Sequence, residues 1–130
     1  MRTSPLSKPT IMVDLKKHRI RIHKHTLQLL GKPEYICILV NPEDQIIAVS
    51  CAVKSDHLAH YINWKAQLNQ KSYELYSMNL VESLREVCVD WQDNRSYRIL
   101  GEIVPAAGVA QFHMRDYIII NGCKTTRSGV

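Results

Sequence analysis

The chain has 130 residues, 45% of them hydrophobic and 22% charged, a balance that is ordinary for a globular protein and excludes a disordered one. No apolar run approaches the roughly 20 residues that cross a bilayer, so the sequence predicts neither a membrane-spanning helix nor a membrane partner. The 17 Lys and Arg residues outnumber the 12 Asp and Glu residues, and the resulting charge of +5 permits either a polyanionic partner or simply a basic solvated surface.

The first predicted elements are two short strands joined by a basic turn. Residues 1–9 are polar and contain two prolines, which predicts a flexible arm. From residue 11 to residue 15, every second position is apolar, as in a strand, and the alternation resumes with the opposite parity at Ile20. Because side chains alternate strictly along a strand, this change of parity indicates a turn or a bulge at residues 16–19.

A short helix and a β-hairpin follow. Residues 26–31 (TLQLLG) predict a helix that ends at Gly31, and Pro33 prevents its continuation. Residues 35–40 are a continuous apolar run and residues 45–51 a second strand-like segment. The turn-forming sequence NPED between them, at residues 41–44, predicts that the two strands pair as a hairpin.

The middle of the chain predicts a linker and then the longest helix. Within the linker, residues 54–71, apolar positions recur at helical spacing after Ser55, which indicates a connecting helix. A short strand is expected near residues 73–75. One apolar stripe from Leu80 to Trp91 then predicts a helix over residues 79–91, which begins at Asn79.

Three strands, at residues 97–103, 109–114 and 117–120, precede a polar tail at residues 121–130. The order strand, helix, strand, turn, strand thus occurs twice in the chain, as a repeat of pattern with little sequence identity. We therefore predict an α+β fold. In it, two strand–helix–hairpin units, at about residues 11–53 and 72–120, share one core within a single globular domain over residues 10–120.

The segment from Arg19 to Cys51 resembles the AbrB/SpoVT-like swapped-hairpin family of bacterial DNA-binding proteins. Six residues match the family outline of a basic, alternating strand, a short helix ending in Leu-Gly and a hairpin: Arg19, Ile20, Ile22, Leu27, Leu30 and Gly31. The chain departs from this outline at His18 and His23, where the family has Gly and Pro. The resemblance implies a tandem pseudo-dimer within one chain and a bacterial or phage transcriptional regulator, which binds DNA through basic loops and strands.

The same region carries a dense group of cations. Five basic residues fall within nine positions: Lys16, Lys17, Arg19, Arg21 and Lys24. Cations at every second position of a strand share one face and can pair with successive phosphates of double-stranded DNA. The alternative interpretation is a solvated strand face, whose charge keeps a sheet edge from aggregating.

Metal and disulfide sites are not predicted. His57 with His60, and His23 with His25, have spacings that suit a metal ion, but no third ligand stands at a recognisable distance in the sequence. Three of the four cysteines (Cys37, Cys51, Cys88 and Cys123) lie in largely apolar surroundings, and no CxxC motif or signal peptide is present. We therefore expect reduced thiols and a cytoplasmic protein without cofactors.

No nucleophile, phosphate-binding or dinucleotide-binding motif occurs, and Asp90, Asp93 and Glu102 have no paired spacing that indicates acid–base catalysis. The sequence predicts a non-enzymatic DNA-binding regulator, of the antitoxin type, that contacts phosphates through residues 16–24. Two alternatives stay open. One is a protein-interaction module in which the hairpins form a homo-oligomer. The other is a small enzyme whose site depends on the fold, for example with Cys51 or Cys123 as nucleophile.

Overall fold

The computed structural model describes residues 8–120, so residues 1–7 of the predicted arm and the whole predicted tail lie outside the described residues. The strands are β1 (Thr10–Asp14), β2 (Arg19–His23), β3 (Tyr35–Asn41), β4 (Ile46–Cys51), β5 (His60–Tyr61), β6 (Ser72–Tyr76), β7 (Ser96–Val104) and β8 (Val109–Ile120). The helices are α1 (Lys24–Leu29), α2 (Met78–Val87) and a 3₁₀ turn, η2 (Pro105–Ala107).

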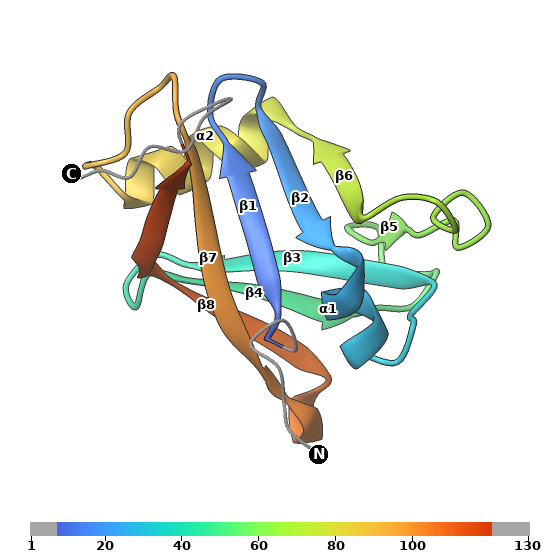
Figure 1. Ribbon diagram of the computed structural model, residues 1–130. Helices are drawn as coiled ribbons and strands as arrows, with labels where there is room; N and C mark the ends of the chain where they lie inside the picture. The colour runs from blue at the N-terminus through green and yellow to red at the C-terminus, as the bar shows by residue number, and fades with distance from the viewer. Residues whose placement is uncertain (1–7, 121–130) are drawn as a thin grey trace, which may run out of the picture.

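All eight strands belong to one antiparallel sheet, in the order β5-β3-β4-β8-β7-β1-β2-β6. The sheet curls into a half-barrel that does not close, with β6 at one edge and β3 with the short β5 at the other (Figure 1). Helix α2 lies across one end of this half-barrel, at the top of the view, and α1 follows the opposite end of β2 (Figure 1).

Both predicted turns join strands at the expected places. The change of parity before Ile20 is a turn between β1 and β2, in which His18 has a positive φ of 51°. In the β3–β4 hairpin, the side-chain oxygen of Asn41 accepts hydrogen bonds from the backbone N–H groups of Glu43 and Asp44. Short polar side chains of this kind stabilise turns by bonding the backbone ahead of them.

One continuous core lies on the concave side of the sheet. Alternate residues of the strands point into it, as do Ile20 and Ile22 of β2, both fully buried. Helix α2 covers this core with Val81 and Leu84, and its first turn is capped by Ser77, whose hydroxyl accepts from the N–H of Leu80. This core includes residues from both halves of the described chain.

Helix α2 is shorter than the predicted helix. It begins at Met78, ends at Val87, and leaves Trp91 outside the helix but 2% exposed in the core. There Trp91 stacks on Tyr97 with 4.5 Å between ring centroids, and Tyr117 meets both rings edge-on. The apolar stripe thus marked buried positions correctly but extended the helix beyond its last turn.

The predicted α+β fold of two strand–helix–hairpin units is wrong, because the molecule is mainly one antiparallel sheet with two short α-helices. The β7–β8 hairpin lies in the middle of the sheet, with the β1–β2 hairpin on one side and the β3–β4 hairpin on the other. Strands of the two predicted units are therefore neighbours, since β1 pairs with β7 and β4 with β8. The predicted internal repeat and the predicted AbrB-like architecture are therefore wrong as well.

Residues 54–71 form turns around β5 in place of the predicted connecting helix. Their apolar spacing reflects packing, because Ile62 is buried and the indole of Trp64 donates to the carbonyl oxygen of Pro33 at 2.8 Å. Over residues 8–120, no helix is long and apolar enough to cross a bilayer.

Candidate functional site

The five cations of the predicted binding segment are divided among three places. Lys16 and Lys17 are exposed in the β1–β2 turn, where their backbone N–H groups donate to the carboxylate of Asp14 at 3.0 and 3.1 Å. Lys24 lies at the other end of β2, and its ammonium donates to the carbonyl oxygens of Gln67 and Leu68 at 2.8 and 3.2 Å. This leaves Arg19 and Arg21 on the strand itself.

Arg19 and Arg21 share the outer face of β2, as predicted from their spacing, but both are paired with carboxylates. Arg19 contacts Asp14 at 2.9 Å, and its side chain is only 13% exposed. Desolvation works against its charge, yet hydrogen bonds with Tyr76 and Asp14 outweigh it and raise the pKa of Arg19. Arg19 is therefore part of a structural ion pair rather than a free cation on a solvated face.

Arg21 is balanced by Glu74 on the neighbouring strand β6. The Nε–H of Arg21 donates to Glu74 at 2.9 Å, and the phenol of Tyr76 donates to the same carboxylate at 3.1 Å. Desolvation raises the pKa of Glu74, but the hydrogen bonds from Arg21 and Tyr76 outweigh it and hold that pKa below its ordinary value. Glu74 is thus ionised at neutral pH and offsets one positive charge.

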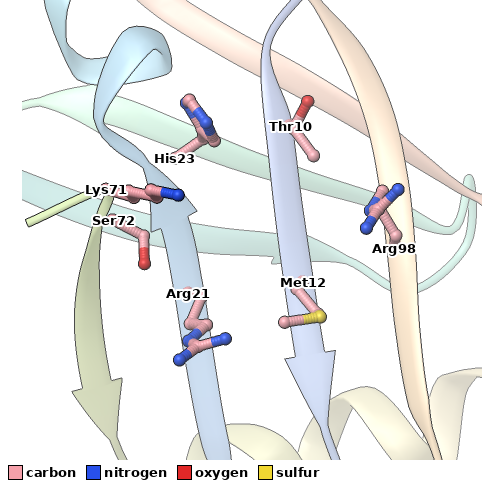
Figure 2. Close-up of a pocket in the computed structure, with 7 residues that line it drawn as sticks. All are labelled: Thr10, Met12, Arg21, His23, Lys71, Ser72 and Arg98. Atoms are coloured by element: carbon pink, nitrogen blue, oxygen red, sulfur yellow. The ribbon is translucent and has the colours of Figure 1, made fainter. Parts of the chain in front are cut away.

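Beside this pair, the outer face of the sheet carries an open hollow of about 290 Å³. Figure 2 shows its lining residues, which come from four adjacent strands and the loop before β6. We call it the basic hollow, and it is lined by Thr10, Met12, Arg21, His23, Lys71, Ser72 and Arg98.

The strand register explains why these residues lie together. Met12 of β1 is directly opposite Arg21 on one side and Arg98 on the other. His23 is opposite Ser72 of β6, so the two strands of the hairpin and their two neighbours all contribute to the same face. Directly paired residues of antiparallel strands point to the same side, which collects these side chains on the outer face.

Two cations of the basic hollow have no acidic partner. Within residues 8–120, neither Lys71 nor Arg98 forms an ion pair, and both are exposed. Because Glu74 offsets Arg21, the hollow holds two positive charges in excess, without counting the histidine. An open face with excess positive charge attracts anions and steers their approach.

His23 contributes a hydrogen-bond donor rather than a charge. Desolvation, and then the charges of His25, Arg98 and Lys71, lower the pKa of His23, so its ring is neutral at neutral pH. Its Nδ1 accepts from the backbone N–H of His25 at 3.1 Å, which assigns the proton of the neutral ring to Nε2. The same bond makes His23 the N-terminal cap of α1.

Lys71 and Arg98 were absent from the sequence-based site, because they are far in the chain from residues 16–24. The one usable signal was parity. Arg98 stands between Tyr97 and Ile99, whose side chains are buried, so its own side chain points outward on a predicted strand. That signal placed Arg98 on a solvated face, but only the pairing of β7 with β1 places it beside Arg21 and His23.

The histidines and cysteines singled out in the sequence are distributed over several separate elements within residues 8–120. In the described part of the chain, no group of three His, Cys, Asp or Glu side chains is arranged for a metal ion, so His57 and His60 have no third ligand there. Cys37 lies 3.2 Å from a carboxylate oxygen of Asp56. Burial, together with that hydrogen bond, raises the pKa of the Cys37 thiol, which is the opposite of what activates a nucleophile.

Cys51 is exposed, and its thiol is directed to the backbone carbonyl oxygen of Leu30 at 3.5 Å. The other proposed nucleophile, Cys123, lies outside the described residues. The basic hollow is therefore the site with the clearest chemistry, which is the binding of an anion.

No family model matches the chain, and no curated protein or solved structure is similar to it at a significant level.

Proposed function

We propose that this chain is a non-enzymatic DNA-binding protein, and that its basic hollow contacts phosphate groups of the DNA. The observation that carries the proposal is the pair of unbalanced cations, Lys71 and Arg98, on an open face of the sheet. Cations on such a face are free to replace the counterions of a phosphate backbone, which is the main source of affinity in sequence-independent binding.

This proposal moves the contact away from the predicted segment. Of that segment, Arg21 lines the hollow, whereas Arg19 and Lys24 are engaged with groups of the protein. Lys16 and Lys17 remain exposed at the far end of the β1–β2 hairpin, and this proposal assigns them no contact with the DNA. The buried thiols of Cys37 and Cys88 support a reducing compartment, in line with a cytoplasmic location.

The test compares two double variants that each remove two positive charges. We expect Lys71→Ala with Arg98→Ala to weaken binding to a duplex of about 20 base pairs and to flatten the log–log salt dependence by up to about two units. Fluorescence anisotropy between about 50 and 200 mM salt measures both effects. Both side chains are exposed, so the variant should keep its circular dichroism spectrum.

The matched control is Lys16→Ala with Lys17→Ala, because these side chains are exposed and only their backbone groups bond Asp14. The control should retain most of the wild-type affinity and slope. Equal losses in the two variants would show that net charge, and not the hollow, determines binding. Absence of wild-type binding at about 50 mM salt would overturn the DNA-binding function altogether.

A second candidate function, assembly into an oligomer, is favoured by the open edge of β3. Beyond the pairing of Tyr35 and Ile36 with β5, no strand of the described chain lies on that side of β3. The strand sequence YICILVN has no charged residue, and Leu39 is 50% exposed. An uncharged strand edge is a template for pairing with another strand.

Sedimentation velocity tests this second candidate. If β3 joins two copies, the wild-type chain should sediment as a dimer, and Leu39→Lys should sediment as a monomer because a charge on an edge strand opposes pairing. Replacing Val53, which is 64% exposed outside the strand, with Lys is the matched control and should leave the dimer intact. A wild-type monomer would exclude assembly through this edge.

A further inference from the structure

The charge of the basic hollow matches a particular kind of phosphate. Its excess is two positive charges, from Lys71 and Arg98, because Arg21 is balanced by Glu74 at 2.9 Å. A phosphodiester within a nucleic-acid strand carries one negative charge. A phosphate monoester carries between one and a half and two at neutral pH, with a second pKa of about 6.

The uncharged donors of the hollow fit the same ligand. The Nε2–H of His23 is left to donate, since Nδ1 already accepts from His25. The hydroxyl of Ser72 has no hydrogen bond with any other described residue and lines the same space. A monoester has three terminal oxygens that accept hydrogen bonds, so it can use these donors and both cations together.

The location of the cations supports one shared ligand. Arg98 and Lys71 lie on opposite sides of the hollow, on β7 and in the loop just before β6, with His23 and Thr10 on the two strands between them (Figure 2). Both cations line the same hollow as His23. An anion in the hollow beside His23 therefore lies between them.

We propose that the basic hollow binds a phosphate monoester, and specifically the terminal phosphate of a DNA strand. This inference rests on the proposed function, because the strand end is supplied by the DNA that the chain binds. At about 290 Å³, the hollow has room for one such group. A terminal phosphate is esterified on one side only, so the hollow does not have to accommodate a second nucleotide. A mid-strand phosphate carries one negative charge, so it would balance one cation of the pair and leave the other to a neighbouring phosphate of the strand.

Two duplexes of identical sequence test the inference, one with 5′-phosphates and one with 5′-hydroxyls, each labelled at a 3′ end. We expect the wild-type chain to bind the phosphorylated duplex at least about tenfold more tightly, as charge-assisted hydrogen bonds to two cations predict. The variant with Lys71→Ala and Arg98→Ala should bind the two duplexes equally. The control with Lys16→Ala and Lys17→Ala should keep the preference.

The outcomes separate this inference from the proposed function. Equal binding of both duplexes by the wild-type chain overturns the terminal-phosphate site and leaves DNA binding standing. Binding of neither duplex overturns the proposed function. In that case, calorimetric titration with adenosine 5′-monophosphate tests whether the hollow binds a phosphate monoester in the absence of DNA. Heat that disappears in the Lys71→Ala, Arg98→Ala variant supports a monoester site that serves a free nucleotide, and no heat from the wild-type chain overturns it.

Discussion

Replacing Asp14 with alanine is expected to lower the free energy of unfolding by about 2–4 kcal/mol, because Arg19, whose side chain is only 13% exposed, then keeps just the more distant carboxylate of Glu74 at 3.7 Å. Asp14 is 7% exposed and lies 2.9 Å from the guanidinium of Arg19. Its other oxygen accepts from the backbone N–H groups of Lys16 and Lys17, so the same substitution removes the bonds that hold the β1–β2 turn. Urea unfolding followed by circular dichroism measures the change.

Two further variants separate the charge from the turn. Asp14→Asn keeps an acceptor oxygen for the turn and removes the negative charge, so it should be more stable than Asp14→Ala. Combining Asp14→Asn with Arg19→Met removes both charges and should recover stability relative to Asp14→Asn, since a buried pair replaced on both sides costs little. A loss below about 1 kcal/mol for Asp14→Ala would show that the pair does not anchor the hairpin.

Leu84→Ala is expected to cost about 2–5 kcal/mol, as removal of a fully buried leucine does when the core cannot collapse into the space. Leu84 is 0% exposed on α2 and belongs to the core cluster that also contains Ile47 and Trp91. Because α2 covers one end of the half-barrel, the cavity would lie between the helix and the sheet. The midpoint and slope of urea unfolding report the loss.

Val89→Ala is the matched control, since Val89 lies just beyond Cys88, the C-terminal cap of α2, and is 81% exposed. Its cost should stay within about half a kcal/mol, which is typical of surface substitutions. Equal costs for Leu84→Ala and Val89→Ala would mean that α2 does not use its inward face to cover the core.

Local structure could be predicted from the sequence wherever neighbouring residues determine it. The turn at residues 41–44 lies between β3 and β4 because the side-chain oxygen of Asn41 accepts from the backbone N–H groups of Glu43 and Asp44, and the change of parity before Ile20 is a turn. The stripe from Leu80 to Trp91 identified core residues for the same reason: the spacing of apolar side chains records which face is buried. Each of these signals acts over a few residues.

Strand order could not be predicted, because it depends on which distant strands meet. Nothing in β1 specifies that its second neighbour is β7, since any strand with one apolar face can cover the same core. The error in fold class came from this step, and the candidate site was incomplete for the same reason. Residues 16–24 carried a visible run of cations, whereas Lys71 and Arg98 become neighbours of Arg21 only through long-range pairing.

The position of β7 between β8 and β1 also sets the time at which the chain can fold. During synthesis, the β1–β2 hairpin leaves the ribosome early, but a hairpin of two short strands is barely stable alone in water. Thr10 pairs with Leu100, so β1 gains its second neighbour only after about 90 further residues have been made. The complete sheet therefore forms late, when β7 and β8 arrive between two hairpins that have already been translated.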